Sequence, residues 1–247
     1  MIYKNELEWS ATPLGTYLME REQLFFDKAV ADIFGFNALQ LGKPQQNLLR
    51  SCRIPFCFVS DPLGPATVRA EFTALPYANQ SIDLLLLPHI LEFSEHAHQI
   101  LREAERVLMP EGQLIITGFN PLSLWGLRSA FHKNNFYPWQ GKFINLLRVK
   151  DWLALLGFEI VGGKMCCYAP PIQREKWLRR FEFLEAMGDR WWALAGGVYF
   201  LQAKKKVAGM RLIMPAWKNA AATKTSLAPA AQKRFNLQKN VDLENSE

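Results

Sequence analysis

Residues 71–120 change their hydrophobic period twice, and this constrains the fold more than any other feature of the chain. The five-residue apolar run Leu84–Pro88 is too short for a helix, which predicts a strand buried on both faces. Between residues 100 and 108 the apolar residues recur at three- and four-residue steps, which predicts a helix with Ser94 as its N-cap. Gln113–Thr117 follows as another strand. This order is a βαβ crossover, the repeating unit of an open α/β sheet.

The remaining elements extend the same pattern on both sides of this unit. The first 35 residues predict one amphipathic helix that caps the sheet or covers a cofactor. Further strands are expected over Phe36–Leu41, Ile54–Val59, Thr67–Phe72, Phe158–Cys167 and Gly197–Ala203, and further helices over Gln45–Arg50, Val149–Leu156 and Arg174–Met187. Gly157 stands where a left-handed residue ends a helix, and Asp83 is assigned a structural role at the head of its strand.

These elements predict three parts of the chain. Residues 1–35 form a helical cap, and residues 36–206 form an α/β domain with an aromatic-rich insert at about 120–143. Residues 207–247 form a basic tail that is expected to be disordered, because no periodic apolar face continues into it.

The formal charge of +6 lies entirely in the C-terminal region. Residues 1–203 hold 20 basic and 20 acidic residues, whereas residues 204–240 hold nine basic residues and no acidic one. A balanced body argues against an extended basic groove for nucleic acid, so nucleic-acid binding is expected at most through the tail.

The cysteines and apolar runs favour a cytoplasmic protein. Cys52, Cys57, Cys166 and Cys167 show no C-x-x-C spacing, and the start of the chain does not read as a signal peptide. The apolar run at residues 191–201 is shorter than the roughly 20 residues that cross a membrane, so no membrane span is expected.

Five short motifs resemble the class I S-adenosylmethionine-dependent methyltransferases, and in particular the type-11 group. They are Leu75-Pro76-Tyr77, Ser81-Ile82-Asp83, Leu101-Arg102-Glu103, Arg106-Val107-Leu108 and Pro110-Glu111-Gly112. The resemblance is firm over about residues 68–120 and extends more weakly over 36–203. It implies a Rossmann-like sheet of seven mostly parallel strands, the last one reversed, with helices on both faces.

The resemblance also implies S-adenosylmethionine as cofactor, with contacts that can be carried over by position. Gly42 matches the first glycine of the cofactor loop and Asp61 the acid that holds the ribose. Glu71, followed by Phe72, falls where the family places its adenine contact, and Pro88 and His89 follow the fourth strand.

The sequence departs from the family at Leu41-Gly42-Lys43-Pro44, which replaces the glycine-rich turn. Proline fixes φ and adds bulk where the backbone is expected to approach the cofactor. Other roles for the matched residues therefore stay open: Gly42 as a strand end, Asp61 as a turn residue before Pro62, and Glu71 as a solvated surface acid.

Candidates for catalysis and substrate binding follow the fourth and fifth strands. His89 and Glu92 stand three residues apart and are candidate proton acceptors, although a buried, hydrogen-bonded histidine is the alternative. Asn120, Trp125, Tyr137 and Trp139 are candidate substrate residues, with local core packing as the alternative for the aromatic ones. No metal site is expected, because His96 and His98 would point to different faces of a helix.

The sequence thus predicts a methyltransferase that acts on a small molecule, at oxygen or carbon. Two alternatives remain. One is a pseudoenzyme that keeps the fold as an interaction module but binds the cofactor poorly, which Lys43 and Pro44 favour. The other is an RNA methyltransferase that uses the basic tail to contact phosphates. The sequence predicts neither the methyl acceptor nor the oligomeric state.

Overall fold

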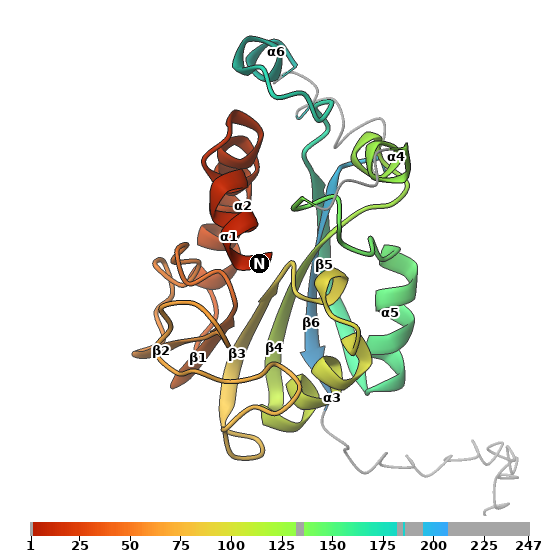
Figure 1. Cartoon of the computed structure of the whole chain (residues 1–247). Coiled ribbons are helices and arrows are strands. Elements are labelled where there is room, and N and C mark those ends of the chain that lie inside the picture. Colours follow the sequence, from red (N-terminus) through yellow and green to blue (C-terminus); the bar gives the residue numbers. More distant parts are fainter. Residues whose placement is uncertain (1, 132–135, 182–184, 186–194, 207–247) are drawn as a thin grey trace, which may run out of the picture. The chain divides into compact units, whose positions relative to one another are not determined.

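A six-stranded sheet with the strand order β2-β1-β3-β4-β6-β5 organises the chain (Figure 1). The computed structural model describes residues 2–131, 136–181, 185 and 195–206. The strands are β1 Asn37–Leu41, β2 Phe56–Ser60, β3 Ile82–Pro88, β4 Leu108–Phe119, β5 Phe158–Cys166 and β6 Val198–Lys205. The helices are α1 Ile2–Ser10, α2 Pro13–Ala31, the 3₁₀ turn η1 Leu91–Phe93, α3 Ala97–Val107, α4 Leu124–Phe131, α5 Leu146–Leu155 and α6 Glu175–Arg180.

The direction of the strands confirms the predicted fold class. Strands β2, β1, β3 and β4 run parallel, and β6 lies antiparallel between β4 and β5. The last strand is therefore the reversed one. Because β1, β2 and β3 are parallel neighbours, the loops that follow them meet at one edge of the sheet, where open α/β sheets bind their ligands.

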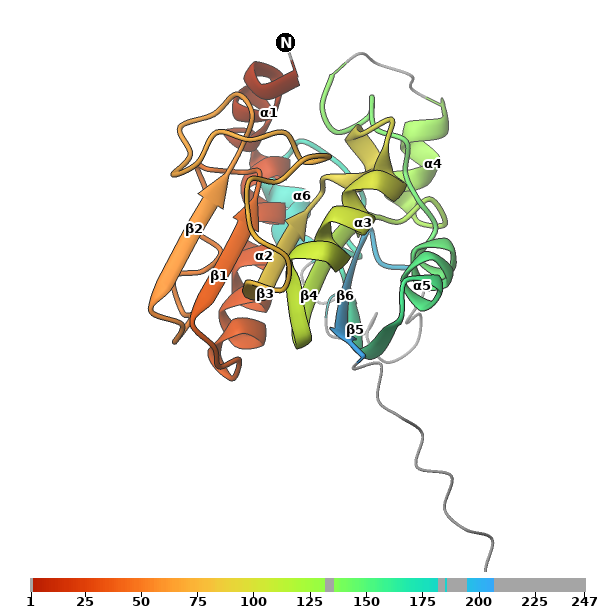
Figure 2. The same cartoon turned by 90° about the horizontal axis from the view of Figure 1, so that it is seen from below.

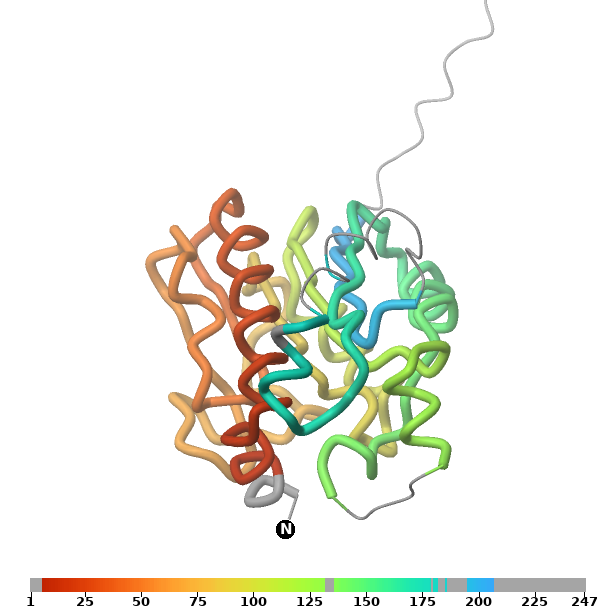
Figure 3. The backbone as a smooth tube through the Cα atoms, turned by 90° about the horizontal axis from the view of Figure 1, so that it is seen from above, coloured from red at the N-terminus to blue at the C-terminus, as the bar shows by residue number. Residues whose placement is uncertain are grey.

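Strand alternation divides the core into two layers. Ala38, Leu84 and Ile115 face α2, and the intervening residues, such as Leu39 and Leu85, face α3 and α5. Figure 2 shows α2 and α3 on opposite faces of the sheet. In Figure 3 α6 lies next to α2, so it adds to the same layer.

The predicted N-terminal helix is two helices, because Thr12 and Pro13 interrupt it. Pro13 opens α2, and the Thr12 hydroxyl accepts a hydrogen bond from the Gly15 amide at 3.2 Å. Figure 2 shows α1 beside the carboxyl ends of β1 and β2. The break thus lets the first helix reach the edge where the loops converge.

Two predicted elements do not form. The strand expected over Thr67–Phe72 is reduced to an isolated bridge between Val68 and Ser60, and its approach contains two prolines that cannot donate a ladder hydrogen bond. The helix expected over Gln45–Arg50 is a series of turns. Its carbonyl and amide groups bond instead to a buried glutamine side chain, described below.

Other boundaries shift by a few residues. The helix predicted to start at Ser94 starts at Ala97, and the Ser94 hydroxyl accepts a hydrogen bond from the His96 amide at 3.0 Å instead of capping α3. Gly157 ends α5 with φ +79°, as expected of a left-handed cap. The predicted helix Arg174–Met187 is seen as α6, and Met187 and the tail 207–247 lie outside the described residues.

Candidate functional site

A cavity of about 380 Å³ lies at the carboxyl ends of β1, β2 and β3. Its volume falls in the range of about 300 to 1,000 Å³ that small-molecule sites occupy. Gly42 and Lys43 follow β1, Asp61 follows β2, and His89 follows β3, and all four line the cavity. Glu6, from α1, lines the cavity as well.

The altered loop after β1 is built around the side chain of Gln40. The Gln40 amide nitrogen donates to the carbonyl oxygens of Gly42, Lys43 and Gln46 at 2.9–3.0 Å, and its oxygen accepts from the Leu48 amide at 3.1 Å. One buried side chain therefore contacts four backbone groups of this loop, and its two N–H protons are shared among three carbonyls. Such a loop keeps its shape without the family's later glycines.

Pro44, the most unusual residue of this loop, does not line the cavity. Gly42 has φ +68°, and a Cβ there would lie 3.6 Å from Ile90 and Phe72, which is an ordinary contact. The bulk introduced at this loop therefore leaves the cavity open. Gly42 itself lines the cavity.

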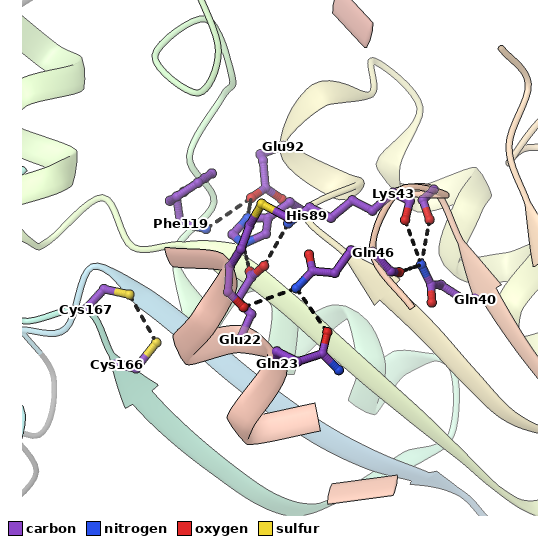
Figure 4. A network of polar contacts seen from close by, with 12 residues as sticks. Glu22, Gln23, Gln40, Lys43, Gln46, His89, Glu92, Phe119, Cys166 and Cys167 are labelled. Carbon is purple, nitrogen blue, oxygen red and sulfur yellow. Dashed lines mark hydrogen bonds and ion pairs between the residues drawn. The ribbon is translucent and has the colours of Figure 1, made fainter. Parts of the chain in front are cut away.

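A chain of buried charged side chains runs beneath the cavity (Figure 4). The Glu22 carboxylate, from α2, pairs with Lys43 Nζ at 2.8 Å through Oε2 and with His89 Nε2 through Oε1. The other imidazole nitrogen, Nδ1, lies 2.7 Å from Glu92 Oε1, which also accepts from the Phe119 amide at 3.1 Å. The chain thus joins α2, the loop after β1, the loop after β3 and the end of β4.

Burial and charge act in opposite directions on this chain. Burial alone would raise the pKa of Glu22, but Lys43 and His89 lower that pKa to about 2. Burial alone would lower the pKa of His89, but Glu22 and Glu92 raise it above its usual value of 6.5. We therefore assign His89 as an imidazolium that donates from both nitrogens.

The structure brings the predicted pair His89 and Glu92 together but corrects their expected role. An imidazolium with both nitrogens bonded to carboxylates has no lone pair to accept a proton, so His89 is not the general base. Glu92 is buried and is not among the residues that line the cavity. Lys43 and His89 both have positive φ, +47° and +53°, a backbone state that is uncommon outside glycine and is found at functional sites.

Asp61 is a turn residue, one of the two roles that its sequence context left open, and it also lines the cavity. Its Oδ1 accepts hydrogen bonds from the amides of Leu63, at 2.8 Å, and Gly64, which makes it a turn residue. Its Oδ2 accepts no hydrogen bond from the residues that the structure describes, and the residue lines the cavity. The turn therefore fixes the carboxylate in place and leaves one oxygen for a ligand hydroxyl.

Of the two residues expected at the adenine, Phe72 lines the cavity and Glu71 does not. Phe72 lines the cavity with Leu63 and Pro62, which together give an apolar wall. Glu71 is exposed and is not among the residues that line the cavity. Pro88, the last residue of β3, lines the cavity beside His89 as expected.

Tyr137 is the one predicted substrate residue that lines the cavity. Its ring stacks on Phe93 with 4.8 Å between centroids and meets Trp9 of α1 edge-on at 5.2 Å. The buried Tyr137 hydroxyl has no hydrogen-bond partner among the described residues. Burial raises the pKa of Tyr137 well above its usual value, so the hydroxyl keeps its proton and can donate it to a ligand.

The other predicted substrate residues belong to the interior. Asn120 holds the chain just after β4 through two hydrogen bonds. Its side-chain nitrogen donates to the Gly196 carbonyl at 3.0 Å, and its side-chain oxygen accepts from the Leu122 amide at 3.0 Å. Trp125 is fully buried and donates to the Ala169 carbonyl at 3.0 Å. Trp139 is buried, and the Arg128 guanidinium carbon lies over its ring, 4.9 Å from the ring centre. None of the three lines the cavity.

Sequence reasoning missed Glu6, Glu22 and Gln40. Glu22 acts through a contact with His89 that spans 67 positions, and Glu6 is brought to the cavity only by the fold. The Gln40 contacts are local, two to eight positions away. A buried Gln40 inside an apolar strand is the one available signal, because a buried amide needs partners. In the described residues no cluster of three His, Cys, Asp or Glu is arranged to hold a metal ion. No described helix is long and apolar enough to cross a bilayer.

Residues 50–116 match the family described as methyltransferase domain, type 11, which confirms the resemblance over that segment. The chain is 33% identical over 162 residues to the "Uncharacterized protein YafS" of Escherichia coli K12, covering 62% of this chain and 65% of that protein. It is 35% identical over 88 residues to "Malonyl-[acyl-carrier protein] O-methyltransferase 1" of Coxiella burnetii, covering 33% and 31%. The chain thus spans less than two thirds of either relative.

Solved structures support the fold. A Thermotoga maritima S-adenosylmethionine-dependent methyltransferase, described as a possible histamine N-methyltransferase, aligns with TM-score 0.58 at 17% identity, over 83% of this chain and 97% of that one. A S-adenosylmethionine-dependent methyltransferase from Archaeoglobus fulgidus aligns with TM-score 0.54 at 16% identity, over 76% and 94%. Together with the strand order, these matches confirm a Rossmann-like class I methyltransferase sheet.

Proposed function

We infer that this chain, which has the class I methyltransferase fold and carries the type-11 methyltransferase domain in residues 50–116, is an S-adenosylmethionine-dependent methyltransferase acting on a small molecule. Transfer is to oxygen or carbon. The observation that carries this proposal is the convergence of Gly42, Asp61 and Phe72 on one cavity at the carboxyl ends of β1, β2 and β3.

The charges around the cavity suit this donor. Glu6, Asp61 and Glu95 line the cavity, and Glu22 and Glu92 are buried beneath it, which makes five carboxylates against the two cations Lys43 and protonated His89. S-adenosylmethionine supplies a methyl group on a positively charged sulfur, and a surplus of carboxylates stabilises a cation in a partly buried cavity. The excess also disfavours a donor or an acceptor that is an anion.

Each contact of the donor has a residue in position. Asp61 Oδ2 would accept from the ribose hydroxyls, Phe72 and Leu63 would cover the adenine, and the backbone at Gly42 would border the methionine part. The stacked Tyr137 and Phe93 rings form the wall on which an apolar acceptor would rest. Holding both partners in line is the main demand on the protein, since the methyl group is already activated.

The test is binding followed by transfer. S-adenosylhomocysteine should bind the purified chain with a stoichiometry of one by isothermal titration calorimetry, and S-adenosyl-[methyl-³H]methionine should label a small acceptor. A protein with the fold but without calorimetric binding at millimolar ligand would be the pseudoenzyme of the alternative prediction. The RNA alternative depends on residues 207–247, which lie outside the described residues, and RNA binding lost on truncation at Pro215 would support it.

A further inference from the structure

The Glu6 carboxylate and the Tyr137 hydroxyl both line the cavity. The Glu6 carboxylate, which is half-buried, makes no hydrogen bond or ion pair with the residues that the structure describes. The Tyr137 hydroxyl is buried and has none either. Tyr137 packs against Trp9, which lies one helical turn from Glu6 in α1, so both groups border the same part of the cavity. A buried polar group without a partner is costly, which indicates that a ligand completes the pair.

Helix α1 is what places Glu6 and Trp9 together. The two residues are three positions apart, so they share one face of the helix. Trp9 packs edge-on against the Tyr137 ring, and the same helix face therefore presents the Glu6 carboxylate to the cavity. Phe93 holds the other face of the Tyr137 ring. The position of the pair is thus fixed by packing.

Glu95 and His96 also line the cavity, but both are exposed to solvent, whereas Glu6 is half-buried. Both nitrogens of His89 are bonded, and Glu92 is not a lining residue. Asp61 serves the turn after β2, where its Oδ1 accepts a hydrogen bond from the Leu63 amide. Burial raises the pKa of Glu6 above 4.5, partly offset by Lys43 and His89, while Asp61 and Glu22 reinforce the rise. A carboxylate with a raised pKa is a better proton acceptor.

We propose that Glu6 is the general base of the transfer and that the methyl acceptor is an uncharged hydroxyl group, oriented by a hydrogen bond from Tyr137. This rests on the function proposed above. The surplus of carboxylates opposes an acceptor that is already an anion, such as a carboxylate or a phosphate, because it would add a further negative charge to the cavity.

The bonds and charges of the step balance. The hydroxyl proton passes to a Glu6 carboxylate oxygen, and the oxygen lone pair forms the new bond to the methyl carbon. The bond between the methyl carbon and sulfur breaks, its electron pair stays on sulfur, and the sulfonium becomes a neutral thioether. Glu6 loses its negative charge as the donor loses its positive charge, so the net charge of the cavity contents is unchanged.

The experiment measures transfer from tritiated S-adenosylmethionine to four probes that share a phenyl ring: phenol, benzyl alcohol, benzoate and phenyl phosphate. We expect the two uncharged hydroxyl compounds to be methylated and the two anions not. Glu6→Gln should lower kcat about 100-fold, the lower end of the usual contribution of a general base, while the Kd for S-adenosylhomocysteine stays within about twofold. Glu8→Gln, on the exposed side of the same helix, should keep the wild-type kcat.

Two further readouts separate catalysis from structure. The wild-type kcat should rise with pH through the raised pKa of Glu6, and Glu6→Gln should lose that limb of the profile, whereas Glu6→Asp should keep part of it. Tyr137→Phe keeps the stacked ring and should lower kcat/KM for the hydroxyl probes by about tenfold, the loss expected for one hydrogen bond.

The outcomes are distinguishable. Transfer to benzoate or phenyl phosphate, an unchanged kcat in Glu6→Gln, or no transfer to any probe by a protein that binds S-adenosylhomocysteine would overturn this inference and leave the donor site standing. Failure of wild-type protein to bind S-adenosylhomocysteine would instead remove the proposed function itself.

Discussion

The Glu22 carboxylate accepts a hydrogen bond from Lys43 Nζ at 2.8 Å, so a side chain of the N-terminal helix α2 holds the loop that follows β1. Lys43 is the residue at which the sequence departs from the family's glycine turn. Its side chain is buried in an ion pair beneath the cavity. The ion pair with Glu22 therefore stabilises the loop in which the sequence departs from the family. The helical cap, which supplies Glu22, is part of the candidate cofactor site.

Glu22→Gln should destabilise the protein by about 3 to 5 kcal/mol near pH 6, the usual cost of breaking a buried ion pair. The Glu22 carboxylate, whose pKa is lowered to about 2, contributes fully above pH 4.5 and loses its contribution as the pH falls toward 2. His89, whose pKa is raised, contributes fully below pH 6.5 and loses its contribution as the pH rises through the raised value.

The stability difference between wild type and Glu22→Gln should therefore be largest between about pH 4.5 and 6.5. Urea unfolding across the pH range measures it. Glu20→Gln, at an exposed position of the same helix, is the matched control and should change stability by less than about 0.5 kcal/mol. A difference between wild type and Glu22→Gln that does not vary with pH would contradict the buried charge chain.

Gln40→Leu should disrupt the loop after β1. The variant leaves the carbonyls of Gly42, Lys43 and Gln46 and the Leu48 amide without their side-chain partner, and each buried unsatisfied group costs about 1 to 3 kcal/mol. We expect a large loss of thermal stability together with a weaker Kd for S-adenosylhomocysteine. Normal binding by a folded Gln40→Leu protein would mean that this loop does not shape the donor site.

Substitutions at Asp61 separate its turn from its binding role. Asp61→Asn keeps an oxygen for the Leu63 and Gly64 amides, so the unliganded protein should keep its Tm within a few degrees. Loss of the carboxylate facing the ribose should weaken S-adenosylhomocysteine binding by about tenfold, which is the worth of a charge-assisted hydrogen bond. Asp61→Ala should lose both stability and binding. Equal affinities in wild type and Asp61→Asn would place the ribose elsewhere.

Phe72→Ala and Glu71→Gln test which neighbour meets the adenine. Phe72 lines the cavity, so its truncation should weaken S-adenosylhomocysteine binding by about tenfold, as expected for loss of an aromatic contact. Glu71 is exposed outside the cavity, and its variant should bind with the wild-type affinity. The reverse result, measured by the same titration, would restore the expectation drawn from the family's pattern.

Hydrophobic periodicity was enough to predict the sheet but not its complete strand set. The alternation of buried strands with amphipathic helices predicted the strands that form, and Gly157 marked a helix end because it needs a positive φ. The reversed last strand was implied by the resemblance to the methyltransferases and not by periodicity. Thr67–Phe72 fails as a strand, because it is separated from β2 by a proline-rich turn that leaves only one bridge. Local composition therefore predicts strands and helices more reliably than it predicts which strands pair in the sheet.

The candidate site was predicted where its residues follow strands, and missed where they come from the cap. Gly42, Asp61 and His89 end parallel strands, so topology alone brings them together. Glu6 and Glu22 look like ordinary solvent-facing acids of an amphipathic helix. Only the fold reveals that one lines the cavity and the other is buried against His89.

The most direct test of the central claim is calorimetric titration of the wild-type protein with S-adenosylhomocysteine, supported by its thermal midpoint. We predict saturable binding with one site and, at 100 times Kd, a stabilisation of about 2.7 kcal/mol, which raises the Tm by roughly 5 to 10 °C for a domain of this size. No heat of binding and no change in Tm at millimolar S-adenosylhomocysteine would contradict the account.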